Sequence, residues 1–467
     1  MNNLSTLDAG FLEVEDADRR VSLAIGAVAV IEGPPPNQEA LLPALDQRVR
    51  ACPRFGHRLR LHPLDLAAPE WVQDPHFDLG RHVRRVALPQ PGNDRELFGL
   101  IADVMARRLD RDRPLWEIWV IEGLAGGKWA ILTKLHHCMA DGIAATHILT
   151  ALFDDDIRDS FAGKICPHKA PGPERLSPDE SGANPLNSLG GLWSLVTALT
   201  AGVARTAQGA AEIVAGLLHP AASSLNGPIS DLRRYSGARV ALADIELVCQ
   251  KFDVTINDVA LAAVTESFRE LLIKQGERPR PDSLRTLVPV SVRSAGALGE
   301  TDNRVSLMLP YLPVEEENPV QRLRTVHSRL NRTKAGGQRQ AGHAFLAITN
   351  RLPFSLSSWA IRLLMRLPQR GVVTVATNVP GPRRPLQFMG RRVLAMYPIS
   401  PIALQLRIAV AMLSYADDLF FGILADYDVV ADIDQLARGI EAAVARLVAI
   451  SKGRKTPRRR GKLSLVV

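Results

Sequence analysis

The chain has 467 residues, of which 46% are hydrophobic and 23% are charged, so it can bury a sizeable core and does not have the composition of a disordered protein. Its length predicts two or three domains. The formal net charge is +8, but residues 451–467 contain seven Lys and Arg and no acidic residue, which leaves the rest of the chain nearly neutral. This distribution argues against a nucleic-acid-binding protein, which would carry a basic face on its folded body.

The cysteines and the N-terminal residues predict a protein of the reducing cytoplasm. The four cysteines are widely spaced and form no CxxC pair, so we expect free thiols and no zinc site. The first 20 residues are polar and acidic, unlike a signal peptide. The sequence has no uninterrupted apolar run of about 18 residues, so we expect no transmembrane helix.

Residues 1–153 predict a mixed α/β domain. An apolar stretch rich in β-branched residues at 24–32 predicts a strand. Apolar residues at helical spacing predict a helix over 95–109. Two further strands are expected at 116–121 and 128–135, and the second leads directly into His136.

Residues 154–230 predict a linker, because prolines recur among serines and glycines. Within it, the apolar stretch 192–218 predicts a helix that either packs on the body or lies in a membrane interface. The basic tail 451–467 either contacts anionic lipid or is simply solvated.

Residues 231–450 predict a second mixed α/β domain. A helix is expected to begin near Asn257, with either Asn257 or Thr255 as its cap. Another amphipathic helix is expected over 357–367. The predicted strands are 285–290, 304–309, 371–376, 407–413 and 419–424.

The seven residues from His136 to Gly142 form the pattern HHxxxDG, which is suited to acyl transfer. Attack of an alcohol on an acyl carbon needs a base, and a neutral imidazole can accept the proton near pH 7. An Asp a few residues away, Asp141, can fix the local backbone. Gly142 permits an unusual turn and a close approach of substrate.

A metal site is the alternative interpretation of the histidine pair. Adjacent side chains on an extended segment point to opposite faces, so His136 and His137 would be poor joint ligands. We therefore expect no metal here.

The HHxxxDG run resembles the active-site motif of coenzyme A-dependent acyltransferases with the chloramphenicol acetyltransferase-like fold, and peptide-synthetase condensation domains carry a very similar motif. Further runs distinguish the two. Together they resemble the bacterial wax ester synthase/diacylglycerol acyltransferase family, over about residues 4–448. These runs are LSTLDAGFL at 4–12, WVQD at 71–74, LDRDRPLWE at 109–117, LNGP at 225–228, INDVALA at 256–262, TNVPGP at 377–382, and the pairs 414–415 and 421–422.

The resemblance implies an α/β (α+β) architecture of two chloramphenicol acetyltransferase-like domains, each a mixed sheet with flanking helices and with the active-site channel between them. It implies that His137 is the general base, that His136 supports it and that Asp141 orients the loop. Asn257 would polarise the thioester carbonyl or stabilise the oxyanion. The implied substrate-binding residues are Gly142, Pro114, Leu115, Trp116 and Asn378, although core packing is the simpler explanation for Trp116 and a plain turn for 378–382.

The substrates implied are a long-chain acyl-CoA and either diacylglycerol or a fatty alcohol, with no cofactor. Because both substrates are lipids, a peripheral association with the inner membrane or with lipid droplets is expected. A carrier-protein-dependent condensation-type acyltransferase that uses the same His base is the alternative. A non-catalytic lipid-binding protein that retains the motif is a third possibility.

Overall fold

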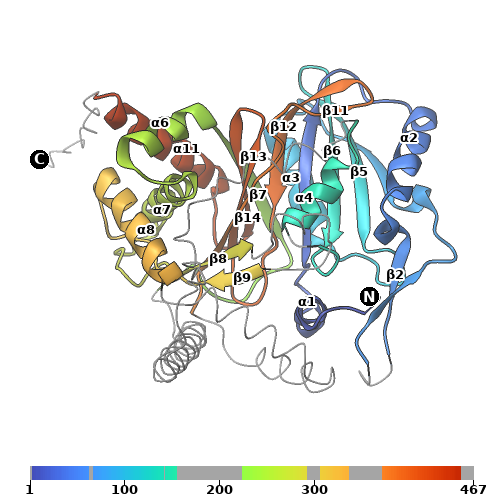
Figure 1. The fold of residues 1–467 in the computed structure, drawn as a ribbon, viewed down its shortest axis with the longest axis horizontal. Coiled ribbons are helices and arrows are strands. Elements are labelled where there is room, and N and C mark those ends of the chain that lie inside the picture. The colour runs from blue at the N-terminus through green and yellow to red at the C-terminus, as the bar shows by residue number, and fades with distance from the viewer. Residues whose placement is uncertain are drawn as a thin grey trace, which may run out of the picture.

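The computed structural model describes residues 3–62, 67–140, 142–154, 223–291, 305–335 and 371–453. These residues form two lobes that lie side by side, each built on a six-stranded sheet (Figure 1). Helices flank both sheets, so the predicted mixed α/β fold is confirmed. Within the described residues, no helix has the length and hydropathy needed to span a membrane.

The sheet of the first lobe has the strand order β11-β12-β1-β6-β5-β4. Its central strands are almost completely buried, which explains their nearly continuous apolar sequences. A turn containing Gly126 and Gly127, both at positive φ, connects β5 to β6. The strands are β1 (Ala24–Ile31), β4 (Val83–Ala87), β5 (Trp116–Leu124), β6 (Lys128–His136), β11 (Gln387–Phe388) and β12 (Arg391–Ile399).

Four α-helices accompany this sheet, together with a small hairpin. Asn93 caps α3 in a full capping box with Glu96, which explains where that helix begins. The helices are α1 (Thr6–Ala17), α2 (Gln38–Arg50), α3 (Asp94–Ala106) and α4 (Gly142–Thr150), with short 3-10 turns at Pro53–Gly56 and Leu79–Arg81. The hairpin pairs β2 (His57–Arg60) with β3 (Glu70–Gln73).

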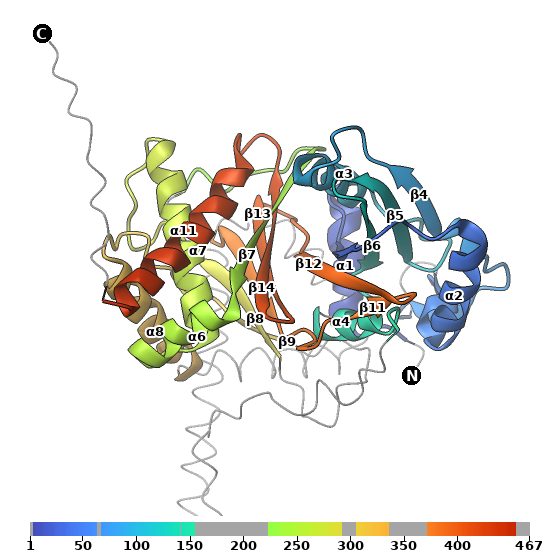
Figure 2. The same cartoon turned by 90° about the horizontal axis from the view of Figure 1, so that it is seen from above.

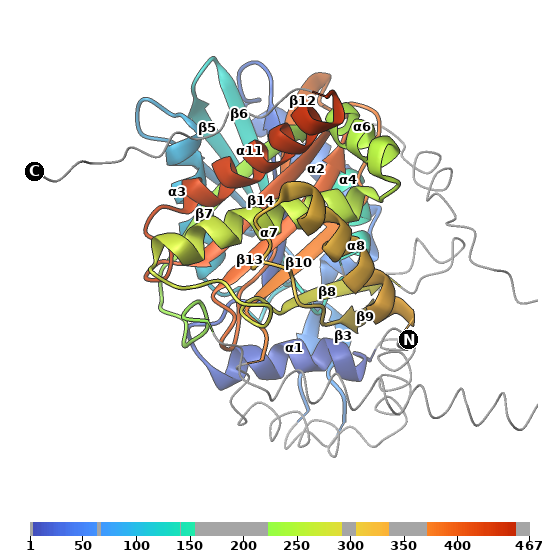
Figure 3. The same cartoon turned by 90° about the vertical axis from the view of Figure 1, so that its left-hand side faces the viewer.

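The sheet of the second lobe has the strand order β7-β14-β13-β10-β8-β9. Four helices of the described residues cover its outer face, and most residues of α7 are buried between the sheet and the other helices (Figure 3). The strands are β7 (Arg233–Ala241), β8 (Thr286–Ser291), β9 (Val305–Met308), β10 (Thr374–Val379), β13 (Ile408–Tyr415) and β14 (Asp418–Asp426). The helices are α6 (Leu242–Phe252), α7 (Ile256–Lys274), α8 (Pro319–Ala335) and α11 (Ile433–Ser451).

The second half of the chain lends β11 and β12 to the first lobe, as the view from above shows (Figure 2). β12 pairs antiparallel with β1, with Ile399 opposite Gly26. Where β12 passes the second lobe, a Cβ on Gly422 would lie 1.7 Å from the Pro398 carbonyl oxygen, so only glycine fits there. The Tyr235 hydroxyl donates to the same carbonyl at 2.9 Å. The sheets therefore do not follow the two halves of the chain.

The predicted elements agree with the structure with some shifts. The strand expected at 371–376 lies at Thr374–Val379. The strands β4, β7, β11 and β12, and the hairpin of β2 and β3, had not been predicted. The division into 1–153, 154–230, 231–450 and 451–467 did not foresee the strand exchange, and its boundaries stay a prediction. The helices expected at 192–218 and 357–367, and nearly all of the basic tail, lie outside the described residues.

Candidate active site

The two motif histidines lie at the end of β6, where backbone contacts on both sides fix the chain. The His136 N–H donates to the Leu115 carbonyl, and the His137 N–H donates to the Leu23 carbonyl, each at 2.9 Å. The Met139 N–H closes a tight turn onto the His136 carbonyl, also at 2.9 Å. The main chain that carries both rings is therefore held by the segments preceding β5 and β1.

Helix α1 contacts both histidine rings. The Phe11 ring stacks on the His137 imidazole, with ring centroids 4.1 Å apart and an interplanar angle of 17°. One turn further along, the Glu15 carboxylate lies 3.6 Å from Nε2 of His136, and both of these side chains are only 1% exposed. At 3.6 Å the two groups are in polar contact but lie beyond ordinary hydrogen-bond distance.

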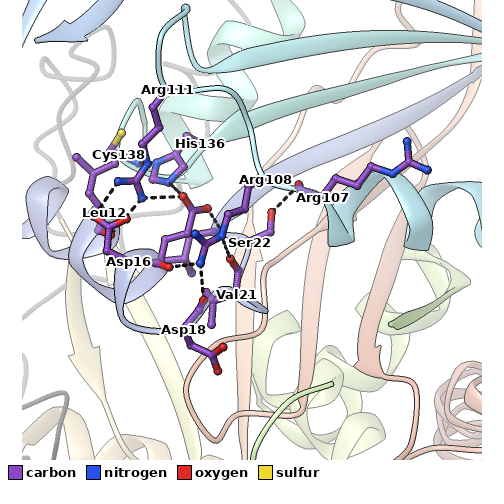
Figure 4. A network of polar contacts seen from close by, with 12 residues as sticks. Leu12, Asp16, Asp18, Val21, Ser22, Arg107, Arg108, Arg111, His136 and Cys138 are labelled. Carbon is purple, nitrogen blue, oxygen red and sulfur yellow. Dashed lines mark hydrogen bonds and ion pairs between the residues drawn. The ribbon is translucent and has the colours of Figure 1, made fainter. Parts of the chain in front are cut away.

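Glu15 is the centre of a polar network that joins α1 to the segment before β5. Figure 4 shows Arg111 and His136 of this network, together with Leu12 and Asp16 of α1. The Glu15 carboxylate accepts hydrogen bonds from the Arg111 guanidinium at 2.9 Å and from the Leu23 N–H at 3.0 Å. Arg111 also binds Asp16 on the surface of α1. Burial alone would raise the pKa of Glu15, but the His136 ring, Arg111 and the Leu23 N–H together lower that pKa to about 2. The buried carboxylate is therefore ionised across the physiological range.

The hydrogen bonds of His136 define its tautomer. The Cys138 N–H donates to Nδ1 of His136 at 3.2 Å, so Nδ1 acts as an acceptor and the ring proton belongs on Nε2. Nε2 is the nitrogen that faces Glu15. The Nδ1 of His136 is thus engaged by the backbone and its Nε2 faces a buried carboxylate, which suits a supporting rather than a reacting ring.

The predicted segment Pro114-Leu115-Trp116 supports the motif from the core. The carbonyl of Leu115 holds the amide of His136, and Leu115 and Trp116 are completely buried. The Trp116 indole donates to the Phe55 carbonyl at 2.9 Å and stacks on the His82 ring. This packing explains Trp116 without a substrate, while a substrate role for the segment stays a prediction.

Gly142 brings the end of the motif against the second lobe. It is the first residue of α4, and a Cβ placed there would lie 2.9 Å from Cγ2 of Val379 at the end of β10. A glycine is therefore explained by close packing of α4 on β10, while close approach of a substrate remains a prediction. Asp141 lies outside the described residues.

Asn378, beside Val379, lies next to the other predicted donor. Its side-chain amide donates to Oδ1 of Asn257 at 3.4 Å. Asn257 is not the helix cap, because Thr255 caps α7 in a capping box with Asp258. The structure therefore decides between the two predicted caps in favour of Thr255 and leaves the Asn257 amide available for another role. Gly142 thus packs on the end of β10 from the first lobe, while Asn378 is a residue of β10 and contacts Asn257 at the start of α7.

A separate cleft of about 480 Å³ opens between α3 and the start of β7 and α11. Both lobes line it, and residues of both charge signs face it, including Arg95, Asp103 and Arg234. None of the predicted site residues lines this cleft.

Sequence reasoning missed Phe11, Glu15 and Arg111 as neighbours of the histidines. Phe11 and Arg111 both lie within the runs that carried the family resemblance, so the runs pointed to them without a role. Glu15 follows the first of these runs by three residues. Only the fold shows that it reaches His136, because 121 positions of chain separate the two and no local pattern joins them.

Two lobes with an exchanged strand, and an HHxxxDG turn at their junction, define an acyltransferase of the chloramphenicol acetyltransferase-like fold. Solved structures agree: the first condensation domain of the CDA synthetase matches with a TM-score of 0.59 over 96% of each chain, at 17% identity, which shows the fold alone. A wax ester synthase/diacylglycerol acyltransferase from Marinobacter aquaeolei VT8 matches with a TM-score of 0.67 and 26% identity, over 96% of this chain and all of that one.

The family itself follows from two domain matches. Residues 4–260 match the wax ester synthase/diacylglycerol acyltransferase catalytic domain, and residues 301–447 match the C-terminal domain of the same family. A Mycobacterium tuberculosis protein named as a probable diacylglycerol O-acyltransferase, tgs1, is 71% identical over the full length of both chains. The chain belongs to the wax ester synthase/diacylglycerol acyltransferase family, as the sequence predicted, and it is an acyltransferase.

Proposed function

We propose that the chain transfers a long-chain acyl group from coenzyme A to the free hydroxyl of diacylglycerol, with His137 as the general base. The full-length identity of 71% to a probable diacylglycerol O-acyltransferase carries the choice of reaction. The position of His137 in the HHxxxDG motif directly after β6, with its ring stacked on Phe11, supports its role as the base.

In the proposed reaction, the His137 imidazole accepts the hydroxyl proton as the oxygen attacks the thioester carbon. The developing oxyanion accepts a hydrogen bond from the side-chain amide of Asn257, which Asn378 orients through the contact at 3.4 Å. The tetrahedral intermediate then expels the coenzyme A thiolate, which takes the proton back from the imidazolium. The ester forms without a covalent acyl-enzyme, a metal or a cofactor, and substrates reach the site through a channel between the lobes.

A fatty alcohol is the second candidate acceptor, because the Marinobacter relative is named a wax ester synthase as well. Purified full-length protein is incubated with labelled palmitoyl-CoA and either dioleoylglycerol or hexadecanol, and the products are separated by thin-layer chromatography. We expect triacylglycerol to form at the higher kcat/KM. If wax ester is the main product, the acceptor is the fatty alcohol and not diacylglycerol.

The donor and the base are tested in the same assay. A palmitoylated carrier protein should not replace palmitoyl-CoA, and turnover with the carrier alone would support the condensation-type alternative. His137→Ala should lower kcat by about a thousandfold, with an unchanged thermal midpoint as the control for folding. Full turnover by a folded His137→Ala protein would contradict the role of His137 and favour another base.

We further propose that the protein works at a lipid surface and that the basic tail contributes to binding there. Full-length protein and a variant with Arg458, Arg459 and Arg460 changed to Gln are sedimented with vesicles of phosphatidylcholine, with and without phosphatidylglycerol. Each basic residue near an anionic surface contributes roughly 1 kcal/mol, so the variant should bind anionic vesicles at least about tenfold more weakly. Equal binding by both proteins would leave the tail as a solvated end.

A further inference from the structure

We infer that Phe11 and Glu15 of α1 are positioning residues, which together set the orientation of the two motif histidines. The inference rests on the proposed function, in which His137 is the base. The two residues are four positions apart in one helix, so their side chains lie on the same face. That face meets the end of β6, where Phe11 contacts the His137 ring and Glu15 contacts the His136 ring.

Glu15 holds the base through two routes. Its carboxylate accepts the Leu23 N–H at 3.0 Å, and the Leu23 carbonyl accepts the His137 N–H at 2.9 Å. It also faces Nε2 of His136, whose Nδ1 accepts the Cys138 N–H. One buried carboxylate thus fixes the backbone on both sides of His137, directly at Leu23 and through the ring of His136.

Arg111 explains why such a carboxylate can be buried. An ionised group that is 1% exposed needs a compensating partner, and the guanidinium of Arg111 supplies it at 2.9 Å. Arg111 is itself held by Asp16 and by the Leu12 carbonyl. All of these groups belong to α1 or to the segment before β5, so α1 is locked against the sheet where the base emerges.

Phe11 contacts the ring of the base itself. The hydrogen bond from the His137 N–H acts on the backbone, whereas the Phe11 contact acts on the plane of the imidazole. A parallel ring at 4.1 Å restricts rotation of the imidazole to orientations that keep the two planes stacked. A general base must be aligned with the proton that it accepts, so this contact bears on turnover rather than on substrate affinity.

Four variants test the inference with palmitoyl-CoA and dioleoylglycerol as substrates. Glu15→Ala removes every contact of the carboxylate and should lower kcat by about 100-fold, the cost of a base misplaced by about 1 Å. Glu15→Gln keeps an acceptor for the Leu23 N–H and should lose less. Phe11→Leu keeps an apolar side chain but loses the ring, for an expected loss of roughly three- to tenfold. Phe11→Tyr should restore the wild-type rate.

In each variant KM for palmitoyl-CoA should stay within about twofold, because the contacts serve the transition state and not the bound substrate. The matched control is Asp16→Asn. It removes another carboxylate of α1 that binds Arg111, but Asp16 contacts neither histidine. The kcat of this variant should stay within about twofold of wild type. Thermal midpoints establish that each protein is folded. If Glu15→Ala does not fold, the Glu15→Gln and Phe11→Leu variants decide the question.

The inference is overturned if folded Glu15 variants keep the wild-type kcat, lose no more than Asp16→Asn, or raise KM in step with the loss. It is equally overturned if Phe11→Leu and Phe11→Tyr behave alike. These results are separable from failure of the proposed function. An inactive His137→Ala protein beside a fully active Glu15→Ala protein removes only the positioning role, whereas an active His137→Ala protein removes His137 as the base.

Discussion

The turn that carries His137 and the helix start that carries Asn257 are held in different ways. In the first lobe, Glu15 reaches the motif from a separate helix and depends on Arg111 for its own burial. In the second lobe, Thr255 and Asp258 cap α7 within four residues of chain. The rings at the end of β6 are contacted by Phe11 and Glu15, so their anchor includes side chains of another element, α1. A side chain in the first turn of a helix is fixed by the cap of that helix.

The largest expected effect concerns Asn257, which lies in the first turn of α7 beside the cap Thr255. Asn257→Ala should lower kcat by about 100- to 1000-fold, as the loss of one oxyanion donor does. Because Thr255 supplies the cap, the free energy of unfolding should hardly change. Steady-state kinetics together with denaturant unfolding provide the two measurements.

Asn378→Ala is the matched variant, since Asn378 contacts Asn257 through its amide at 3.4 Å and would orient the donor without replacing it. Its loss of kcat should be smaller than that of Asn257→Ala. Equal kcat in wild type and Asn257→Ala would remove the oxyanion role and leave Asn257 as an ordinary first-turn residue.

Because Glu15 anchors the first lobe as an ionised carboxylate, the free energy of unfolding should depend on pH in the acidic range. The pKa of Glu15 is lowered from 4.5 in the unfolded chain to about 2 in the fold. The carboxylate therefore stabilises the fold fully above pH 4.5, and the contribution is lost as the pH falls toward 2. A shift of this size corresponds to at most about 3 kcal/mol. Urea unfolding of wild type and Glu15→Gln between pH 3 and pH 7 should show a difference that shrinks as the pH falls.

Asp16→Asn is again the control, because Asp16 is 58% exposed and an exposed ion pair contributes little. A difference between wild type and Glu15→Gln that stays constant with pH would mean that the lost contacts are not electrostatic. The contrast between a first lobe anchored by the ionised Glu15 and a second lobe anchored within α7 would then fail.

Strands such as β1 and β6 were predictable, because they carry their burial pattern in their own residues. The exchange of β12 was not, since a strand's sequence does not name its partner: β12 pairs with β1 of the opposite half. β10 was placed three residues early, and its last two residues, Asn378 and Val379, had been assigned to a turn. Pairing over hundreds of residues depends on the whole fold, which local periodicity does not encode.

The candidate site likewise has a part that the sequence predicts and a part that only the fold shows. The HHxxxDG run and the start of α7 were visible because their spacing is local. That Asn257 meets Asn378 could not be read from spacing, since the two come from different elements of the second lobe. The role of Glu15 could not be predicted either, because an acidic residue in an amphipathic helix is ordinarily exposed to solvent. Its burial depends on partners from other elements, Arg111, His136 and the Leu23 N–H.

The smallest expected effect tests whether α7 is indeed held from within. The Thr255 hydroxyl accepts the Asp258 N–H at 3.3 Å and donates to the Asp258 carboxylate at 2.8 Å. Thr255→Ala removes both contacts and should cost about 1 kcal/mol of unfolding free energy, whereas Thr255→Ser should keep them. The Asp258 carboxylate would still accept the Thr255 N–H and the His327 ring at 2.8 Å, so the helix start should shift only slightly. With Asn257 near its place, kcat should fall severalfold at most, in contrast to the much larger loss expected for Glu15→Ala. A Thr255→Ala protein that loses kcat as strongly as Glu15→Ala would show that both lobes depend equally on their anchors, whatever the length of chain between an anchor and the residue that it holds.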